Sequence, residues 1–443
     1  MRTSVVTWLF SLCALPHMGA SMFLGNLDVE VSMKLGILPS VDTPLKPLPP
    51  SQDPWYTAPP DFEHASPGSV LRLRLAPGNI TSVVKSSSAA LNILYRTTDT
   101  HDRPAWAVTT LLLPEKYYVS PSGQLALLSY QFAYDSANVD NSPSYSIFST
   151  LTESDLGIGI SSNTGLLELL LSQGWIVNTP DYEGPTAALG ASVQAGHATL
   201  DAQRAVLNLR RLIGARERLT VALWGYSGGS IATEAAAELQ PYYAPDLAIG
   251  GVAAGGLVED LSADFEYLNQ SPLAGHIASM VLGITAQYPQ ARAYVLSRLR
   301  PETAGEFTQV LNMTLEETLG FFSMRDMYGY FVGGKADLHV PELTRVYARE
   351  KLGGHGTPAV PMYLYKAIHD EYCPIEETDE LVRRYCAAGV EILFERNTVG
   401  GHVSEIENGK PRAMQWLWSV FDGSYRSPHC GCKIRDVTVQ VGK

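Results

Sequence analysis

The chain has 443 residues, 45% of them hydrophobic, and a formal net charge of −13 at pH 7. This length accommodates one large α/β domain with insertions or two ordinary domains, and the apolar fraction excludes an intrinsically disordered chain. The acidic balance argues against nucleic acid or an anionic membrane as a partner, because both attract basic surfaces.

Residues 1–20 have the pattern of a cleaved signal peptide. Met1 and Arg2 form a short positive region, an apolar stretch follows over 5–15, and small residues lead to Ala20. A membrane anchor is the rival interpretation, but this apolar stretch is too short for a bilayer that needs ~20 residues. We therefore expect a secreted protein in which residues 21–65, rich in proline, form an extended arm.

Beyond residue 66, strand and helix patterns alternate. Strands are expected at 90–95, 106–113, 124–130, 175–178, 219–223, 359–365 and 390–394, and helices at 165–173, 200–212, 231–239, 378–388 and 413–421. This alternation predicts an α/β fold with a doubly wound, mostly parallel sheet over residues 66–257 and 346–443. Residues 258–345 break the alternation with amphipathic helical segments, which predicts a helical cap inserted into the sheet.

The most informative motif is Gly225–Gly229, which reads G-Y-S-G-G between an apolar strand and an alanine-rich helix. In that context G-x-S-x-G predicts a nucleophile elbow, a sharp turn that exposes Ser227 at the start of a helix. The turn needs residues that are nearly free of side chain two positions before and after the serine. Ser227 is therefore the candidate nucleophile.

A serine nucleophile needs a base and a residue that orients the base, and in this architecture the chain order is Ser, then Asp or Glu, then His. His402 and Asp370 follow predicted strands in that order. The rival histidines are His197 and His355, which lie before the acid or away from a strand end, and His369, which is next to the acid itself. The rival acids are Glu371, adjacent to the favoured position, and Asp379, inside a predicted helix.

The backbone N–H of Gly228, directly after the nucleophile, is the expected first donor of an oxyanion hole. The HGGG loop that supplies a second donor in many such enzymes is missing, and the strand at 124–130 instead runs into residues 131–136. The sequence contains no metal-binding, phosphate-binding or dinucleotide-binding motif, so we expect neither a metal nor a cofactor.

Cysteine and asparagine patterns agree with export. Beyond the signal peptide the cysteines are Cys373, Cys386, Cys430 and Cys432, an even number that suggests two disulfides in one of three connectivities. N-glycosylation acceptors, if the route is eukaryotic, are Asn79, Asn269 and Asn312.

Several segments together resemble the fungal secretory lipase family, typified by Candida lipase A. They are 129–136, 143–145, 174–184, 225–229, 368–374, 401–402 and 421–423. The resemblance implies an α/β-hydrolase fold, Asp135 as the second oxyanion-hole residue and residues 258–345 as a cap over the acyl site. It also implies a Cys386–Cys430 disulfide, which leaves Cys432 as the natural partner of Cys373.

The motifs and the resemblance predict a secreted serine carboxylic-ester hydrolase that acts on acylglycerols or other lipophilic esters through an acyl-enzyme. The enzyme is expected to be monomeric and to contact a lipid interface transiently. The alternative is an esterase that deacetylates a fungal secondary metabolite, since trichothecene esterases belong to the same family. A serine peptidase and a non-catalytic binding protein are further alternatives.

Overall fold

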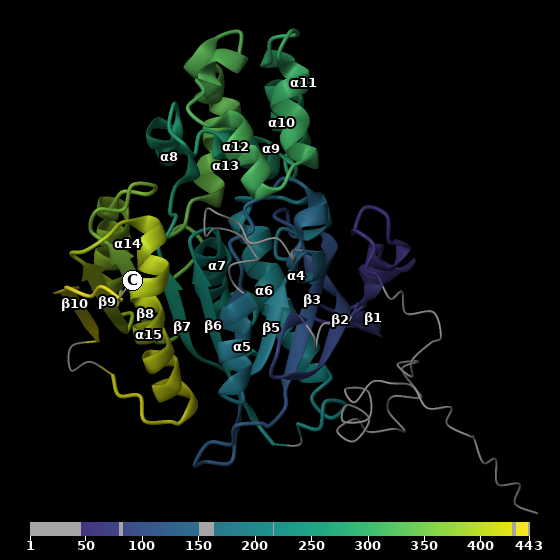
Figure 1. The fold of residues 1–443 in the computed structure, drawn as a ribbon, viewed down its shortest axis with the longest axis vertical. Helices are drawn as coiled ribbons and strands as arrows, with labels where there is room; N and C mark the ends of the chain where they lie inside the picture. Colours follow the sequence, from purple (N-terminus) through teal and green to yellow (C-terminus); the bar gives the residue numbers. More distant parts are fainter. Residues whose placement is uncertain (1–45, 79–82, 150–163, 216, 428–430, 442–443) are drawn as a thin grey trace, which may run out of the picture.

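A mostly parallel sheet runs through the middle of the protein, with helices on both faces and a separate group of helices above one end (Figure 1). The structure is a computed structural model that describes residues 46–78, 83–149, 164–215, 217–427 and 431–441. This part of the chain contains one ten-stranded sheet in the order β1-β2-β3-β5-β4-β6-β7-β8-β9-β10. The predicted α/β class is confirmed.

The strands are β1 (Val70–Leu75), β2 (Ser87–Thr98), β3 (Pro104–Pro114), β4 (Leu125–Gln131), β5 (Ile176–Pro180), β6 (Leu219–Tyr226), β7 (Ile249–Gly255), β8 (Met362–Ala367), β9 (Ile392–Asn397) and β10 (Cys432–Val437). The α-helices are α4 (Pro143–Ser149), α5 (Thr164–Ser172), α6 (Ser192–Asn208), α7 (Gly228–Tyr243), α8 (Leu261–Leu268), α9 (Gly275–Thr285), α10 (Pro289–Arg298), α11 (Ala304–Phe307), α12 (Leu315–Phe322), α13 (Pro341–Glu350), α14 (Ile375–Ala387) and α15 (His402–Phe421). Short 3-10 turns occur at Pro54–Tyr56, Phe62–His64, Val139–Asn141, Gly184–Thr186, Thr308–Asn312, Met327–Tyr330 and Gly334–Leu338.

The sheet is antiparallel at one edge and parallel elsewhere. β1, β2, β3 and β5 pair antiparallel, whereas every pair from β5–β4 to β9–β10 is parallel. Because parallel strands end on the same side, the segments that follow β4, β6, β8 and β9 meet at one edge of the sheet. This edge carries the candidate site.

Helices α7 and α15 cover opposite faces of β6, as the alternation of side chains along a strand requires. A Cβ on Gly225 would come within 2.3 Å of Oγ1 of Thr233 in α7. Trp224, which precedes Gly225, faces the opposite side of the sheet, and its indole N–H donates to the Tyr365 hydroxyl at 2.9 Å. Tyr363, on the same face as Tyr365, stacks on Trp416 of α15. α6 packs against α7.

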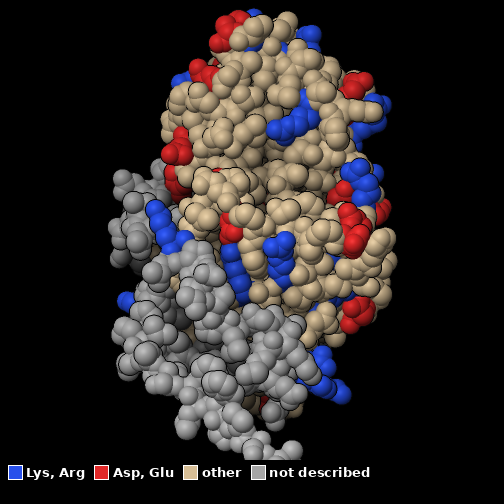
Figure 2. Space-filling view, turned by 90° about the vertical axis from the view of Figure 1, so that its right-hand side faces the viewer, with Lys and Arg blue, Asp and Glu red and all other residues tan. Residues whose placement is uncertain are grey.

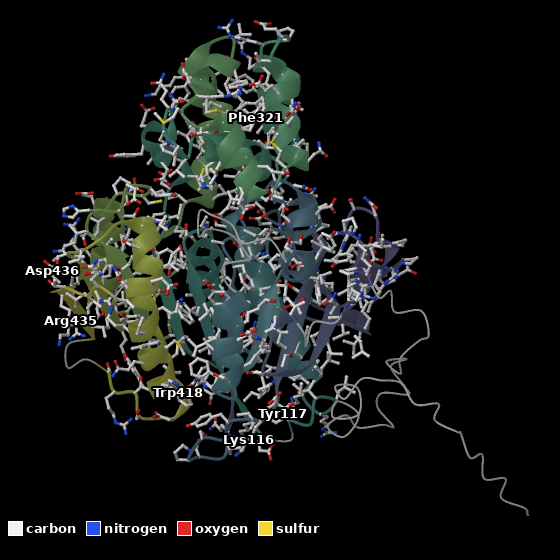
Figure 3. All side chains as sticks on the ribbon, viewed as in Figure 1. Lys116, Tyr117, Phe321, Trp418, Arg435 and Asp436 are labelled. Atoms are coloured by element: carbon white, nitrogen blue, oxygen red, sulfur yellow. A yellow bond between two sulfur atoms is a disulfide. The ribbon has the colours of Figure 1, made fainter. Side chains whose placement is uncertain are left out.

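Helices α8 to α13, residues 261–350, form what we call the upper helical cluster (Figure 1). Fully buried aromatic and aliphatic side chains, including Phe265, Ile277 and Phe322, give it an apolar core of its own. Phe321 lies in this cluster, whereas Trp418 lies toward the far end of α15 (Figure 3). The segment predicted as a cap, 258–345, is therefore helical and stands above the edge that carries the candidate site.

Several elements differ from expectation, including β1, which was not among the expected strands. α6 begins at Ser192, eight residues before the expected start, and α15 begins at His402 itself rather than near residue 413. β10, which the sequence analysis did not predict, is an edge strand with mostly exposed, charged residues. Its Arg435 and Asp436 bond to Glu395 and Arg396 of β9, and Figure 3 shows both at this edge. An edge strand with this composition has little of the apolar signal from which strands are predicted.

The expected signal peptide lies outside the described residues, as do most of the predicted arm and Asn79. Residues 46–65 form short turns held to the sheet, where the Trp106 indole donates to the Tyr56 carbonyl at 2.9 Å. Asn312 is exposed, whereas the Asn269 side chain bonds Asp326 and the Met327 backbone. Within the described residues, no helix is long and apolar enough to cross a membrane.

On the face shown in Figure 2, acidic and basic side chains are scattered among uncharged residues.

The structure corrects the expected disulfides. Cys386 pairs with Cys432, with their Cα atoms 5.6 Å apart, and Cys373 is a buried free thiol. Neither Cys386–Cys430 nor Cys373–Cys432 forms, and Cys430 lies outside the described residues. The reason is topological: Cys432 begins β10 beside Ile392, near the end of α14, whereas Cys373 follows the opposite end of β8. The length of a six-residue strand, roughly 20 Å, separates the two edges.

Reduction of the Cys386–Cys432 disulfide, or the double substitution Cys386→Ser/Cys432→Ser, should lower the free energy of unfolding while the folded enzyme stays active. The bridge closes a loop of 46 residues, for which the chain-entropy model gives about 4 kcal/mol. It lies at the edge opposite the candidate site. Urea unfolding and kcat/KM, measured with and without reductant, test both parts, and unchanged unfolding would contradict the prediction.

Candidate active site

Ser227 occupies a strained turn between β6 and α7, as the elbow pattern predicts. Its backbone has φ 53° and ψ −128°, a region that non-glycine residues rarely adopt. A Cβ on Gly225 would lie 2.2 Å from the Gly229 carbonyl oxygen, and one on Gly229 would lie 2.1 Å from that of Gln131. Only glycine fits at either position, because real Cβ atoms essentially never come within 3 Å of such atoms.

His402 lies against Ser227 at the first turn of α15. Its Nε2 is 2.7 Å from the Ser227 hydroxyl, and its Nδ1 is 2.8 Å from Oδ2 of Asp370. Because a carboxylate only accepts hydrogen bonds, Nδ1 carries the proton and Nε2 is free to accept one from the serine. The imidazole stacks on Tyr372 with ring centroids 4.4 Å apart, so its orientation is fixed by packing as well as by bonding.

The His402 backbone is anchored on both sides. Its N–H donates to Oε2 of Glu371 at 2.8 Å, and its carbonyl accepts from the Tyr226 hydroxyl at 2.6 Å. Glu371, which was weighed as a rival acid, therefore contacts the backbone of His402 and not its ring. This role has no sequence signal of its own, since it depends on how two distant loops meet.

Asp370 has a fully buried side chain in the loop after β8. Its Oδ1 accepts the backbone N–H groups of Tyr372 and Cys373, both at 3.0 Å. Burial by itself raises the pKa of Asp370, but His402, the buried Lys366 ammonium and the backbone donors outweigh burial and hold the pKa below its usual value. The carboxylate is thus charged at neutral pH and holds the imidazole.

The other candidates are placed elsewhere. His355 bonds Ser192 at 2.9 Å, and His197 stacks on Tyr243. His369 is exposed next to Asp370. Asp379 forms an ion pair with Arg396 at 2.9 Å.

Asp135 and Gly228 lie in direct contact beside Ser227. A Cβ on Gly228 would be 1.7 Å from Oδ1 of Asp135, so the loop after β4 approaches the start of α7 as closely as glycine permits. Asp135 itself has a positive φ of 42°. Burial raises the pKa of its carboxyl to about 6, against the lowering effect of His402. Oδ1 has no hydrogen-bond partner among the described residues.

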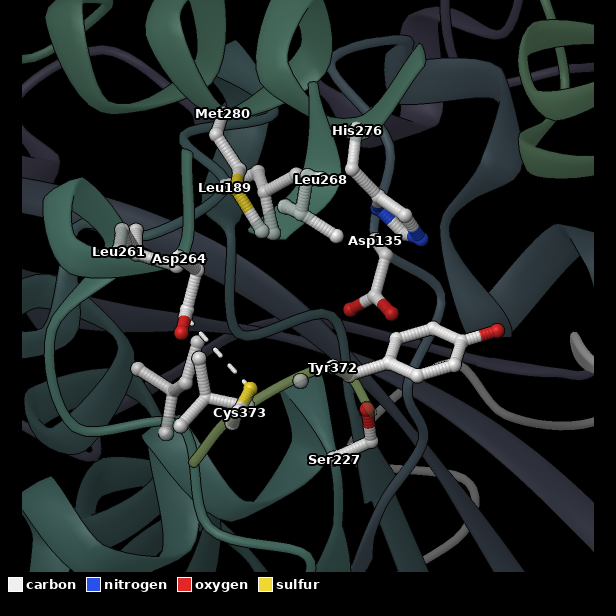
Figure 4. Close-up of a pocket in the computed structure, with 13 residues that line it drawn as sticks. Asp135, Leu189, Ser227, Leu261, Asp264, Leu268, His276, Met280, Tyr372 and Cys373 are labelled. Carbon is white, nitrogen blue, oxygen red and sulfur yellow. Dashed lines mark hydrogen bonds between the residues drawn. The ribbon is translucent and has the colours of Figure 1, made fainter. Parts of the chain in front are cut away.

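A pocket of about 410 Å³, open mouth included, lies between Ser227 and the upper helical cluster (Figure 4). Its walls combine the loop residue Leu189, α7, α8, α9 and the loop that follows β8. The lining side chains are mainly apolar, and they include Leu189, Ile231, Val258, Leu261, Leu268 and Met280. Sequence analysis did not identify these residues, because they come from segments that are far apart in the chain.

Among the residues that the structure describes, no three His, Cys, Asp or Glu side chains gather closely enough to hold a metal ion.

The protein should become less stable as the pH rises from 6.5 to 8, which is above the range in which the buried His197, His276 and His355, with pKa values lowered to about 4, add stability as the pH rises. Burial raises the pKa of Asp135 to about 6 and that of Asp181 to about 7, and burial together with Glu238 raises that of Glu234 to about 8. Because their folded pKa values exceed the unfolded ones near 4, these groups contribute stability fully below pH ~4 and lose it as the pH passes through 6–8. The expected decrease is on the order of 2 kcal/mol.

Urea unfolding at pH 5, 6.5 and 8 measures this dependence. Asp181 accepts from the Ser144 backbone and hydroxyl at 2.8 and 2.6 Å, and Asp181→Asn imitates its neutral form. This variant should show a flatter dependence on pH than the wild type. A free energy of unfolding that is constant or rises between pH 6.5 and 8 would contradict the assignment.

Comparison with known proteins identifies the family. A family model described as secretory lipase matches residues 151–427. A probable trichothecene esterase of Stachybotrys chartarum is 51% identical over 98% of this chain and 87% of that protein. The trichothecene C-3 esterase of Fusarium sporotrichioides is 44% identical over 94% of each chain. The crystal structure of Candida antarctica lipase A in its closed state, 27% identical, covers 88% of this chain and 90% of its own, with a TM-score of 0.78. The chain therefore belongs to the secretory lipase family and is a carboxylic ester hydrolase with the α/β-hydrolase fold.

Proposed function

We propose that the protein is a serine esterase in which Ser227, His402 and Asp370 form the catalytic triad. The observation that carries the proposal is the continuous hydrogen-bonded chain from the Ser227 hydroxyl to His402 Nε2 and from Nδ1 to Asp370. The nucleophile contacts its base, and the base contacts the group that orients it, which is the arrangement that activates serine.

In the proposed reaction, Ser227 Oγ attacks the ester carbonyl carbon while His402 Nε2 takes the hydroxyl proton. The tetrahedral oxyanion is stabilised by the backbone N–H groups of Gly228 and Asp135, beside the positive end of α7. As the intermediate collapses, the C–O bond to the alcohol breaks and His402 returns the proton to the leaving oxygen. A water molecule, deprotonated by His402, then hydrolyses the acyl-enzyme and restores the serine.

The proposed substrate is a short-chain ester, an acetate above all, of a compact lipophilic alcohol of the trichothecene type. Two relatives that match nearly the whole chain carry the name trichothecene esterase. The pocket of about 410 Å³ beside Ser227 is mainly apolar and is roofed by the upper helical cluster, which we propose acts as the cap.

Acylglycerol hydrolysis is the second candidate. It is favoured by the similarity to Candida antarctica lipase A and by the apolar character of the pocket lining. For either substrate we propose an extracellular site of action, supported by the apolar segment at 5–15 and by membership of a secretory family.

An ester panel distinguishes the two candidates. The acyl chain is varied from acetate to oleate on one alcohol, with and without emulsion, and an acetylated trichothecene is included. The proposal expects the highest kcat/KM for acetates and for the trichothecene ester. A preference for oleate that increases in emulsion would instead establish the acylglycerol lipase, and hydrolysis of none of the esters would overturn both.

A further inference from the structure

Two polar side chains from the upper helical cluster face the mainly apolar pocket and have no part in the proposed reaction. Asp264 comes from α8 and His276 from α9, both in the upper helical cluster. Figure 4 shows them on opposite sides of the pocket, with Ser227 below and Leu268 and Met280 between them.

Of the two carboxyl oxygens of Asp264, one accepts a hydrogen bond and the other has no partner among the described residues. Its side chain is buried, with a residue exposure of 1%, and Oδ2 accepts the thiol of Cys373 at 3.5 Å. Oδ1 has no hydrogen-bond partner among the described residues. Burial raises the pKa of this carboxyl well above its ordinary value. The carboxyl can accept a hydrogen bond through Oδ1, and in its protonated form it can also donate one.

His276 is likewise buried, with one polar atom that has no hydrogen-bond partner among the described residues. The residue is 5% exposed, and its Nδ1 has no hydrogen-bond partner in the described part of the chain. Burial, and then the nearby His402, lower its pKa to about 4. The imidazole is therefore neutral at physiological pH, and one ring nitrogen donates while the other accepts.

Unpaired polar atoms of this kind, buried in the wall of a pocket, lower the stability of the folded protein. A buried polar atom without a partner destabilises a fold by ~1–3 kcal/mol, and most buried polar atoms in proteins are paired. The neighbouring positions in the same wall, Leu261, Leu268 and Met280, are apolar. An apolar residue at 264 or 276 would have avoided the cost, so the two polar groups are explained by a ligand that pairs with them.

We propose that Asp264 and His276 form a polar subsite that hydrogen-bonds oxygen substituents on the alcohol part of the substrate. An acetyl group brings no oxygen beyond that of the ester itself, so the partner atoms must belong to the alcohol. The inferred class of substrate is a compact lipophilic alcohol that carries hydroxyl or ether oxygens in addition to the esterified one. This inference rests on the proposed esterase function.

Matched ester pairs test the subsite. Cyclohexyl acetate is compared with the monoacetates of 1,2-, 1,3- and 1,4-cyclohexanediol, which add one hydroxyl at different positions on the same ring. The wild type should hydrolyse at least one hydroxylated ester with a kcat/KM about tenfold higher than the plain ester, the effect of one or two hydrogen bonds. In Asp264→Leu and His276→Leu this ratio should approach one, whereas Asp264→Asn should keep part of it.

Met280→Leu is the matched control, because it changes the shape of the same pocket without changing a polar group. Its preference ratio should stay at the wild-type value even if its rates change. Because the wild-type ratio is itself a result, the test does not depend on the folding of any variant. A wild type that hydrolyses all the esters without preference would overturn the subsite alone. A wild type that hydrolyses none would overturn the proposed function and the subsite with it, and a preference that survives both leucine variants would assign the recognition to other residues.

Discussion

Ser227→Ala is expected to lower kcat for ester hydrolysis by roughly 10⁴–10⁶-fold and to leave the fold intact. The hydroxyl forms the covalent bond to the acyl group in the proposed reaction, and it lies 2.7 Å from His402 Nε2. Alanine keeps the Cβ that the elbow already accommodates, so the turn with φ 53° has no new contact to make. Circular dichroism and thermal unfolding check the fold, and burst kinetics with an activated acetate ester follow the acyl-enzyme.

Ser230→Ala is the matched control within the same helix. Ser230 lies one turn further along α7, fully buried, and its hydroxyl has no partner among the described residues. Its removal should leave kcat close to the wild-type value. A fluorophosphonate should label the wild type and Ser230→Ala but not Ser227→Ala. Hydrolysis at the wild-type rate by folded Ser227→Ala would remove Ser227 from the reaction.

The parts of the candidate site whose placement could be predicted from the sequence are those defined by local constraints. The elbow needs glycine at 225 and 229 because the turn brings backbone atoms within about 2 Å of where a Cβ would be. His402 and Asp370 could be chosen because the chain order and the ends of parallel strands limit where such groups can meet. The structure brings the side chains of Ser227, His402 and Asp370 into contact.

The parts that were missed depend on contacts between segments far apart in the chain. Cys432 pairs with Cys386 because β10 adds to the sheet edge in parallel with β9, and a strand in which half of the residues are charged gives little sign of that placement. The polar pair Asp264 and His276 lies on two helices of the upper helical cluster, whose apolar periodicity predicts burial but not the pocket that both helices face.

The start of α15 was missed for a different reason. Gly409 and Pro411 are poor helix formers, so the sequence favoured a helix that begins after them. In the structure the helix continues through both positions. A Cβ on Gly409 would lie 2.3 Å from the Tyr365 ring, so the glycine lets the helix approach β8. Tertiary packing overrides local propensity here, and the consequence is that His402 belongs to a helix and not to a flexible loop.

Asp370→Asn should lower kcat/KM by about 10³–10⁴-fold, although the substitution is nearly isosteric. Oδ1 of Asp370 accepts two backbone N–H groups at 3.0 Å, and the amide oxygen of asparagine would take that place. The amide NH₂ would then face His402 Nδ1. Two donors cannot bond each other, so the imidazole would move its proton to Nε2 and could no longer accept the proton of Ser227. The loop would stay in place while the base is held in the wrong tautomer.

Glu371→Gln is the control that separates the two neighbouring acids. Glu371 accepts the His402 backbone N–H at 2.8 Å, and a glutamine oxygen can accept the same bond. Its kcat/KM should stay within a few-fold of the wild type. If Glu371→Gln lost activity while Asp370→Asn kept it, the orienting acid would be Glu371. The hydrogen bond between Asp370 and Nδ1 would then be structural, and the proposed triad would need a different third member, because the tautomer of His402 decides whether Ser227 can be deprotonated at all.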